Sequence, residues 1–511
     1  MLIGLGAEEV EASLQTLYLM SERLGASLSV LRERTLCDEN GDRKAMEILI
    51  RKVPDDQQSI ELRIAVLGNV DVGKSTLLGV LTQGELDNGR GSSRLNLFRH
   101  RHEIQSGRTS SISREILGFS TDGDPVTYNI CRTPEDICEA SSKLITFIDL
   151  AGHQKYLRTT VFGLMGHLPH FAMLLVSAVS GVAGTTKEHF ALAMALDLPV
   201  IIVINKVDLV SAEVLGKTTE QIEQFMKSPV GKKIPTTIKN EDDAITVASS
   251  MTAGNITPIF YVSNVTGHGL NLLYTFFNVL PPCISNRERD NLLQLEPEFQ
   301  IDETFCVGQI GTVVGGLLVS GIVRIGDWFN MGPLHDGSFV PVRVTSIHRH
   351  RVPCRVVRAG ESATLALTNS TENLAQKEIR KGMILTTCVT LPTCMYFQAK
   401  VTMLEPSDIL NHHRNNYRSS IGAGFQATVH VGNVRQTAVV VAIMGKPSLA
   451  ANETGSVMFR FLKYPEYIHS GCRLLFRQGC AKGIGQVLQA FPYGIDDADP
   501  LSTLVKNGDS D

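Results

Sequence analysis

The sequence predicts a doubly wound, mostly parallel α/β domain that is followed by two small β-barrels and preceded by a short α/β region. Three observations support this order. With 511 residues, the chain is too long for a single hydrophobic core. From residue 61 to residue 262, near-continuous apolar runs alternate with helical stretches, as in parallel strands that are buried on both faces. Beyond Phe299, short β-branched segments separated by glycines replace this pattern, which is typical of small barrels.

The elements follow in order along the chain. Between Ala7 and Leu24, apolar side chains recur near helical spacing, which predicts a helix within the first α/β region. The buried strands of the larger domain are expected at residues 64–67, 144–148, 172–176, 200–204 and 259–262. The boundaries are expected at 1–58 for the N-terminal region, 59–283 for the α/β domain, 284–298 for a polar linker, 299–390 and 391–493 for the barrels, and 494–511 for a mobile tail.

Composition narrows the class of protein. The chain is 43% hydrophobic and 20% charged, and it has no apolar run near the roughly 20 residues that a membrane span needs, so we expect a soluble protein without a membrane partner. Its start lacks a basic segment and a sustained apolar core, which argues against a secretion signal. Ten cysteines are scattered singly, as expected for reduced thiols in the cytoplasm. The net charge of −4 offers no general attraction to nucleic acid, and we expect a monomer with no DNA partner.

A phosphate-binding loop is predicted at Gly68-Asn-Val-Asp-Val-Gly-Lys-Ser75, directly after a predicted strand and before an apolar helix. Glycines at 68 and 73 let backbone N–H groups close around phosphate oxygens, Lys74 supplies a cation, and Ser75 can bind Mg²⁺. The alternative is a chance Gly/Lys turn, which the strand and helix on either side argue against. The predicted phosphate contacts are Gly68, Asn69, Val70, Asp71, Val72, Gly73, Lys74, Ser75 and Thr76, together with Gly152.

A guanine-binding motif is predicted at Asn205-Lys206-Val-Asp208, after an apolar strand. The Asp208 carboxylate accepts two hydrogen bonds, which the N1–H and the exocyclic amine of guanine can donate and adenine cannot. This argues against an ATP-using enzyme on the same loop. A four-residue motif of this kind is more often a solvated turn when it stands alone, but here it follows a phosphate loop at a strand end. Ser263, Asn264 and Val265, after the last predicted strand, complete the base pocket.

Between the two motifs, Asp149-Leu-Ala-Gly152 ends another predicted strand. Asp149 can hold Mg²⁺ through water, and the Gly152 N–H can contact the γ-phosphate. His153 follows at once, where a side chain could orient the water that attacks this phosphate. The alternative is a histidine with a structural or solvated role. These residues together predict a Mg²⁺-dependent GTPase that converts GTP and water to GDP and phosphate.

These motifs resemble the translational GTPases of the elongation factor Tu type, in which histidine follows the Asp-x-x-Gly motif as His153 does here. Alignment of Gly107-Arg-Thr109 with the family's Gly-Ile-Thr pattern implies that Thr109 contacts Mg²⁺ and the γ-phosphate. The resemblance thus implies His153, Thr109 and Lys74 as catalytic residues and Ser75, Thr109 and Asp149 as metal ligands. Arg108 departs from the pattern, because the family usually has an apolar residue there that helps to gate the histidine.

The resemblance extends over residues 60–489. Gly321-Ile-Val-Arg-Ile-Gly-Asp and Lys463-Tyr-Pro-Glu-Tyr are similar to segments of the second and third domains of elongation factor Tu. Gly84-Glu-Leu-Asp-Asn-Gly-Arg-Gly and Val431-Gly-Asn-Val-Arg-Gln-Thr-Ala look like the eukaryotic GTP-binding protein 1 and 2 family. This implies a cytosolic GTPase, slow without an activator, that is related to ribosome-delivery and ribosome-rescue factors.

The implied partners are the ribosome, as activator, and a tRNA or a rescue-type protein as cargo. Basic side chains of the presumed effector stretch could contact RNA phosphates or form a solvated face; they are Arg90, Arg94, Arg99, His100, Arg101, His102 and Arg108. An alternative function stays open, a nucleotide-dependent scaffold or switch in RNA decay or signalling without ribosome-activated turnover.

Overall fold

The computed structural model describes residues 4–38, 41–52, 60–227, 233–308, 310–369, 379–388, 391–404, 420–478 and 481–493. The chain forms two compact units. The first contains Met1–Leu157 and Pro169–Cys283, and the second contains Arg158–Leu168 and Ile284–Asp511. The expected mobile tail, residues 494–511, lies outside the described residues. No helix within the described ranges is long and apolar enough to cross a bilayer.

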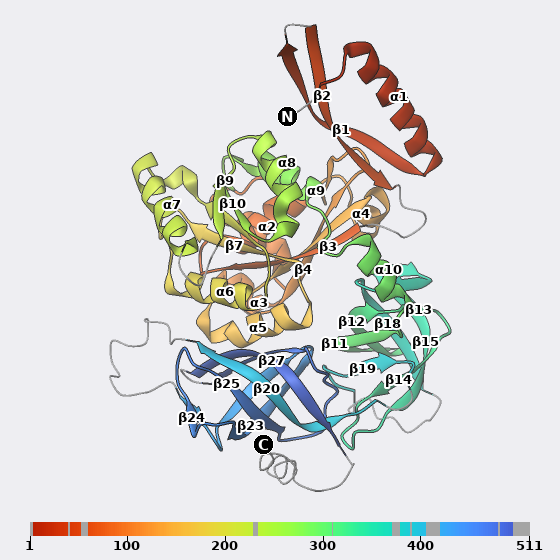
Figure 1. Ribbon diagram of the computed structural model, residues 1–511, viewed down its shortest axis with the longest axis vertical. Coiled ribbons are helices and arrows are strands. Elements are labelled where there is room, and N and C mark those ends of the chain that lie inside the picture. The colour runs from red at the N-terminus through yellow and green to blue at the C-terminus, as the bar shows by residue number, and fades with distance from the viewer. Residues whose placement is uncertain are drawn as a thin grey trace, which may run out of the picture. The chain divides into compact units, whose positions relative to one another are not determined.

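The N-terminal region consists of helix α1 (Ala7–Arg23) and an antiparallel pair, β1 (Ala26–Asp38) and β2 (Gly41–Lys52). The register pairs Ala26 with Lys52 and Asp38 with Gly41, so the two strands form one long hairpin (Figure 1). This two-stranded sheet with one helix buries little apolar surface. Among the described residues, its buried hydrophobic side chains are Val10 and Leu28. Its stability therefore depends on contacts with the α/β domain.

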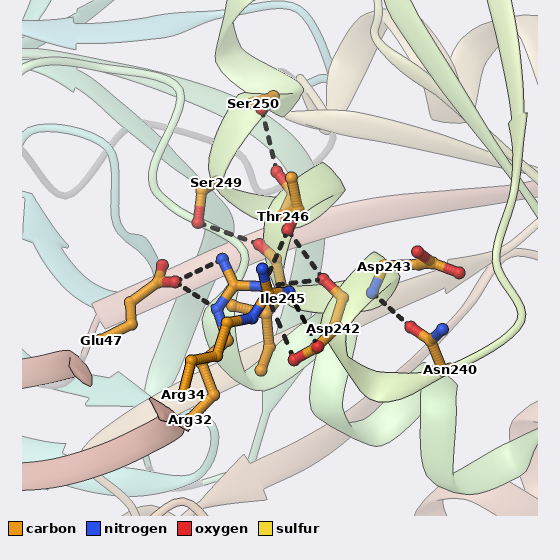
Figure 2. Close-up of polar contacts among 10 residues, drawn as sticks. All are labelled: Arg32, Arg34, Glu47, Asn240, Asp242, Asp243, Ile245, Thr246, Ser249 and Ser250. Atoms are coloured by element: carbon orange, nitrogen blue, oxygen red, sulfur yellow. Dashed lines mark hydrogen bonds and ion pairs between the residues drawn. The ribbon is translucent and has the colours of Figure 1, made fainter. Parts of the chain in front are cut away.

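One such contact joins the hairpin to the start of helix α8 (Glu241–Ser250), as Figure 2 shows. The Arg34 guanidinium lies 2.9 Å from the Asp242 carboxylate. Arg32 pairs with Glu47 across the hairpin and donates to the Thr246 hydroxyl at 3.1 Å. Arg34 and Asp242 are about half exposed, so this surface pair adds orientation more than stability.

The second contact is buried. Arg51 of β2 donates to the backbone oxygens of Ser120 and Asn278, at 3.0 Å each, and to the Asn278 side chain at 2.7 Å. Beside it, Lys143 donates to the backbone oxygens of Phe277, Asn278 and Leu280. These oxygens lie at the C-terminal end of helix α9 (Leu270–Val279), where the helix dipole favours cations. Burial lowers the pKa of both Arg51 and Lys143.

The α/β domain is built on an eight-stranded sheet in the order β5-β4-β6-β3-β7-β8-β10-β9. The strands are β3 (Ile60–Gly68), β4 (Ser113–Phe119), β5 (Pro125–Val126), β6 (Lys143–Asp149), β7 (Phe171–Ser177), β8 (Val200–Asn205), β9 (Ile234–Thr237) and β10 (Ile256–Val262). The run from β6 to β9 is parallel, and β4 and β5 form an antiparallel edge. The sequence predicts β3, β6, β7, β8 and β10. It misses the parallel edge strand β9 and the antiparallel edge, because β9 and β4 contain polar or charged residues and β5 has only two residues.

Helices cover both faces of the sheet (Figure 1). Alternate strand residues, such as Ile64, Phe147 and Met173, pack with residues of α2 (Lys74–Gln83), α8 and α9 in one core. Helix α6 (Gly184–Ala195) contacts β3, β7 and β8. Since both faces are buried, the strands read as continuous apolar runs. The remaining helices of this unit are η1 (Ser92–Leu97), α3 (Arg101–Ser106), α4 (Pro134–Ala140), η2 (Gln154–Tyr156), η3 (Val207–Leu209), α7 (Ala212–Met226) and η4 (Met251–Ala253).

The second unit contains two closed barrels, which confirms the predicted fold order. In the first barrel, β14 pairs with both β19 and β15 and so closes the ring β14-β19-β11-β12-β18-β15. Its strands are β11 (Glu298–Val307), β12 (Gly311–Ser320), β14 (Trp328–Gly332), β15 (Val340–Arg349), β18 (Ser362–Asn369) and β19 (Ile384–Thr386), with β13 (Ile322–Arg324), β16 (Val352–Cys354) and β17 (Val356–Arg358) beside them.

The second barrel follows the order β20-β25-β23-β22-β26-β27. Its strands are β20 (Cys394–Leu404), β22 (Gln426–Val431), β23 (Val434–Ile443), β25 (Thr454–Phe461), β26 (Arg473–Gln478) and β27 (Ala481–Pro492), with the short pair β21 (Ile421–Gly422) and β24 (Ser448–Leu449). Helices α5 (Leu157–Gly166) and α10 (Asn286–Gln294) complete the list. Helix α10 lies within the stretch expected to be a linker; Ser285 and Glu288 cap its start.

A buried ion pair connects the two barrels. Arg380 binds both carboxylate oxygens of Glu466, at 2.9 and 2.8 Å, and its guanidinium stacks 4.0 Å from the ring centre of Tyr464. The Gln436 amide donates to the same carboxylate at 2.8 Å. Glu466 is 1% exposed, so these hydrogen bonds compensate for the loss of its hydration.

Candidate nucleotide-binding site

The predicted phosphate loop joins the end of β3 to the start of α2. Asp71 and Gly73 have positive φ angles of 61° and 91°, which turn the chain sharply before Lys74 begins the helix. The first N–H groups of a helix have no partners inside it, and their dipoles favour an anion. The Lys74 ammonium bends back over the loop and donates to the backbone oxygens of Gly68, at 3.2 Å, and of Asn69, at 2.8 Å.

Lys74 is almost fully buried, with 6% of its surface exposed. Burial lowers the pKa of its ammonium to about 8, although Asp149 and Asp71 act in the opposite direction. In the absence of further negative charge, the lysine therefore loses its proton when the pH rises only slightly above neutral. A phosphate group beside it would favour the charged form.

The three predicted metal ligands meet behind the loop. The Ser75 hydroxyl lies 2.7 Å from the Thr109 hydroxyl and donates to Asp149 Oδ2 at 2.6 Å. Thr109 donates to the same carboxylate oxygen at 3.3 Å. The other oxygen, Asp149 Oδ1, is buried without a hydrogen-bond partner among the described residues, and burial raises the pKa of this carboxyl. One carboxylate and two hydroxyls are hard oxygen donors of the kind that Mg²⁺ takes together with nucleotide phosphates, so the residues fit this ion.

Gly152 follows β6 and passes close to the loop. A Cβ atom at this position would lie 2.7 Å from the Gly68 carbonyl oxygen, so a side chain here would displace the phosphate loop. His153 is partly exposed and accepts a hydrogen bond from the Lys155 N–H at Nδ1, at 3.0 Å. When the ring is neutral, its proton therefore sits on Nε2. Arg108 is exposed and lines the same pocket as His153.

The two predicted base-binding segments lie at the ends of the neighbouring strands β8 and β10. The Asn205 side chain donates to the Val72 carbonyl at 2.9 Å, and the Lys206 ammonium donates to the Asp71 carbonyl at 2.7 Å, so this segment supports the phosphate loop. The Asp208 carboxylate is exposed and faces the pocket. Ser263 is fully buried, and its hydroxyl accepts the N–H of Thr266 at 3.1 Å.

Two adjoining pockets bring the candidate residues together. The first, of about 420 Å³, is lined by Val70, Asp71, Gly73, Lys74, Ser75, Thr76, Arg94, Gly107, Arg108, Thr109, Gly152 and His153. The second, of about 810 Å³, is lined by Asp71, Gly73, Thr76, Asp87, Gly89, Arg90, Gly91, Arg94, Asn205, Lys206, Asp208, Leu209, Asn264 and Val265. Some predicted residues lie beneath these surfaces and support them, namely Gly68, Asn69, Val72, Asp149 and Ser263.

Sequence reasoning missed two carboxylates that organise the segment between α2 and β4. Glu103, which is 1% exposed, accepts hydrogen bonds from the N–H groups of Ser110 and Ser111 at 2.7 and 2.9 Å. Asp87 accepts the N–H groups of Gly89 and Gly91 at 2.9 and 3.0 Å. The sequence Asp-Asn-Gly-Arg-Gly at 87–91 is a turn signal that could have identified Asp87. Glu103 also caps the start of α3, where it accepts the N–H of His100 at 3.1 Å, but its contacts with Ser110 and Ser111, seven and eight residues away, have no local sequence signal.

The comparisons with known proteins agree with this geometry. The profile of the elongation factor Tu GTP binding domain matches residues 61–282. GTP-binding protein 2 of Mus musculus is 54% identical over 499 residues, which cover 97% of this chain and 80% of the mouse protein. The chain belongs to the GTP-binding protein 1 and 2 family. GTP-binding protein 1 of Xenopus laevis is 43% identical over 489 residues, which cover 95% of this chain and 71% of the frog protein.

Solved structures support the fold of this GTP-binding protein 1 and 2 family member. The translation elongation factor SelB from Methanococcus maripaludis, crystallised with the GTP analogue GppNHp, aligns with a TM-score of 0.57 at 20% identity. The alignment covers 85% of this chain and 80% of SelB. Together with the matched domain, the family membership makes this chain a member of the translational GTPases, and its elongation factor Tu-type domain implies a GTPase.

Proposed function

We propose that this chain is a Mg²⁺-dependent GTPase that acts in the cytoplasm at the ribosome, in delivery or in rescue and quality control. The observation that carries the proposal is the phosphate pocket, where His153 lines the same surface as Lys74, Ser75 and Thr109. A histidine directly after Gly152 is the residue type that separates translational GTPases from signalling GTPases, which have glutamine there.

The proposed binding roles follow from the contacts. Lys74 directs a buried cation at the β- and γ-phosphates, and the Gly152 N–H contacts the γ-phosphate. Ser75, Thr109 and Asp149 would hold Mg²⁺, which would supply positive charge to neutralise the nucleotide phosphates. Asp208 accepts the N1–H and the amine of guanine, and Asn205 and Lys206 hold the base-binding and phosphate-binding segments together.

The proposed catalytic role of His153 is to orient the attacking water. Because its Nδ1 accepts the Lys155 N–H, the neutral ring presents an Nε2–H donor to a water molecule. A water held by a donor is positioned without being deprotonated, so we expect slow turnover when the protein is alone. An activator that moves His153 towards the γ-phosphate would raise the rate.

The ribosome is the proposed activator, and a tRNA or a rescue-type protein is the proposed cargo. The support is indirect: the aligned SelB structures are described as translation elongation factors, and the matched domain is that of elongation factor Tu. A nucleotide-dependent scaffold in RNA decay or signalling would use the same pocket without ribosome-activated turnover. We expect the protein to act as a monomer.

The test compares GTP hydrolysis by the purified protein with and without ribosomes, for the wild type and for His153→Ala. We expect ribosomes to stimulate the wild type, and His153→Ala to bind GTP normally but to lose about 10²-fold or more of the stimulated rate, as for a positioned water-orienting group. Lys74→Ala, which should not bind GTP tightly, is the negative control. Wild-type protein that binds GTP but gains nothing from ribosomes would support the scaffold function instead.

A further inference from the structure

The Arg94 side chain lines both of the adjoining pockets of the candidate nucleotide site. Arg94 lies in η1, and it lines the phosphate pocket with Thr109 and Gly152 and the base pocket with Asp208. Four residues line both pockets, namely Asp71, Gly73, Thr76 and Arg94. Arg94 is the cation of this shared set. The structure therefore places this arginine inside the nucleotide site, whereas the sequence grouped it with possible RNA-binding side chains.

The surrounding backbone leaves room for the Arg94 guanidinium. A Cβ atom on Gly91 would lie 2.6 Å from Arg94 Nε, and a Cβ atom on Gly107 would lie 2.9 Å from Arg94 Nη2. Both glycines have positive φ angles, 83° and 64°, so side chains are disfavoured there on two grounds. The guanidinium fills the space between two segments that come from opposite ends of the effector stretch.

The loop that carries Arg94 is held in place by Asp87. This carboxylate is 7% exposed and accepts the N–H groups of Gly89, Gly91 and Ser93. The Asp87 N–H in turn donates to the carbonyl oxygen of Asn264, in the base-binding segment, at 2.9 Å. Arg94 is thus preorganised at the pocket by a turn that is tied to the base-binding segment.

The guanidinium lacks a complete set of acceptors within the part of the chain that the structure describes. Arg94 Nε is buried and has no hydrogen-bond partner among the described residues. A buried charged donor without an acceptor costs free energy, and the fork of an arginine matches phosphate oxygens. A phosphate group in the shared part of the two pockets would supply acceptors to the guanidinium that lines it.

The residues on either side of Arg94 indicate which part of the nucleotide lies next to it. Ser75, Thr109 and Gly152 mark the β- and γ-phosphate end, and Asp208 marks the base end. The part of a guanine nucleotide between these ends is the α-phosphate with the ribose, and Thr76 lies at the start of α2, whose N–H groups face phosphates. Resting on the proposed GTP-binding function, we propose that Arg94 donates hydrogen bonds to the α-phosphate of the bound guanine nucleotide.

This contact predicts a distinctive effect on affinity. GDP and GTP share the α-phosphate, so Arg94 holds the effector stretch against the nucleotide in both states. Removal of the guanidinium should lower the affinities for GDP and for the GTP analogue GppNHp by a similar factor. We expect about 10- to 100-fold, as for the loss of hydrogen bonds to a charged group. Lys74, by contrast, acts at the β- and γ-phosphates.

The experiment measures the affinities of full-length protein for fluorescent GDP and GppNHp. The variants are Arg94→Ala, Arg94→Lys and, as a matched control, Arg132→Ala, which removes an exposed arginine that lines neither pocket. We expect similar losses for both nucleotides in Arg94→Ala, smaller losses in Arg94→Lys and none in Arg132→Ala. Unchanged affinity in Arg94→Ala, or a loss confined to GppNHp, would overturn the α-phosphate contact.

A second measurement keeps the test valid if Arg94→Ala disturbs the effector stretch. The two diastereomers of GDP with one sulfur on the α-phosphate present sulfur, a poor acceptor, to opposite sides. The wild type should prefer one diastereomer, and Arg94→Lys should reduce this preference several-fold; an equal preference in both proteins would refute the contact. A wild type that binds no guanine nucleotide would refute the proposed function as well, which distinguishes the two failures.

Discussion

Lys74 links nucleotide affinity to pH, because burial lowers the pKa of its ammonium to about 8. As the pH rises through this value, the free protein loses the lysine charge that attracts the phosphates. We therefore expect GDP affinity to fall between pH 7 and pH 9, approaching about tenfold per pH unit above the pKa, when one proton is taken up on binding. Equilibrium titration with fluorescent GDP at each pH measures this slope.

Lys74→Arg is the control, since its guanidinium keeps its charge over this range. Deprotonation of guanine itself affects both proteins alike, so the ratio of their affinities isolates the lysine. A ratio that does not change with pH would mean that Lys74 stays fully charged beneath the loop.

The Asp208 carboxylate faces the base pocket, and its proposed role is to set base specificity. Asp208→Asn replaces one acceptor by an N–H₂ donor, which opposes the N1–H and amine of guanine and suits the second oxygen of xanthine. We expect GTP affinity to fall by about 10²-fold or more and xanthosine triphosphate to bind better than to the wild type. Competition between the two nucleotides measures the change, with Asp122→Asn, an exposed loop variant, as control. Retained preference for GTP would remove Asp208 from base recognition.

At the scale of elements, Glu103 holds the stretch between α3 and β4 that carries Thr109. Burial would raise the pKa of this carboxyl, but hydrogen bonds from Ser110 and Ser111 lower it to about 2. Its folded pKa lies below the unfolded value, so its contribution to stability is present above pH 4.5 and is lost as the pH falls through about 2. The carboxylate is therefore ionised under all ordinary conditions, and the stretch depends on its negative charge.

We expect Glu103→Gln to loosen this stretch and to separate Thr109 from Ser75. In the presence of Mg²⁺, affinity for GppNHp should fall by about tenfold, within the range for hydrogen bonds to a charged group, while GDP affinity changes less. Limited proteolysis between residues 99 and 111 should become faster. Glu85→Gln, at an exposed position of the same connection, is the control. If Glu103→Gln has the same cleavage rate and the same affinities as the wild type, the serine hydroxyls and the backbone hold the stretch without the negative charge of Glu103.

In the segment around Arg94, the local sequence determines the turn, whereas the tertiary structure determines where the arginine side chain lies. The turn at Asp87 is encoded locally, in an Asp-Asn-Gly-Arg-Gly sequence. The position of the Arg94 guanidinium depends on Gly107, thirteen residues along the chain, and no local pattern indicates it. Helix α10 is a local feature that composition concealed: it is mostly polar, with Leu292 and Leu293 as its apolar residues, but the Ser285 and Glu288 capping pair signals its start.

At the scale of the whole chain, the parallel strands other than β9 could be predicted, as could the nucleotide motifs, because each is a contiguous run with a strong physical signature. Ile64 to Leu67 is apolar throughout, since it is buried on both faces, and the phosphate loop follows at once. The antiparallel strand β4 and the long hairpin β1-β2 could not be predicted, because charged residues interrupt their apolar pattern. Examples are Arg32, Glu33 and Arg34 in β1, and Arg114 and Glu115 in β4. The pairing of β4 with β6 also joins residues about thirty positions apart, which no local pattern indicates.

The buried pair between the barrels gives a prediction for the second unit. Burial raises the pKa of Glu466 to about 7, while Arg380 opposes this increase. A carboxyl whose folded pKa is raised binds its proton more tightly in the folded state, so its contribution to stability falls as the pH rises from about 4.5 to 7. Arg380→Met removes the opposing cation and should extend this loss to higher pH.

We expect Arg380→Met to destabilise the protein by about 3–5 kcal/mol, the usual cost of leaving one partner of a buried pair alone, and more at pH 8 than at pH 6. Thermal unfolding of the full chain at both pH values measures the effect. The double variant Arg380→Met with Glu466→Gln is the control, because it leaves no buried charge and should recover part of the loss. Equal destabilisation at both pH values would indicate lost packing against Tyr464 instead of an uncompensated carboxylate.

The two buried cations at the end of α9 have a practical consequence for dissection of the protein. A fragment that begins at residue 59, where the sequence places the start of the α/β domain, would keep Lys143 and lose Arg51. The side chain of Asn278 would then lose the guanidinium that donates to it, and the carbonyl of Ser120 would keep only the Ser142 hydroxyl among its described side-chain donors. The smallest fragment that retains its own hydrogen-bond partners therefore includes β2, and with it the paired strand β1, whatever role the N-terminal hairpin has in the cell.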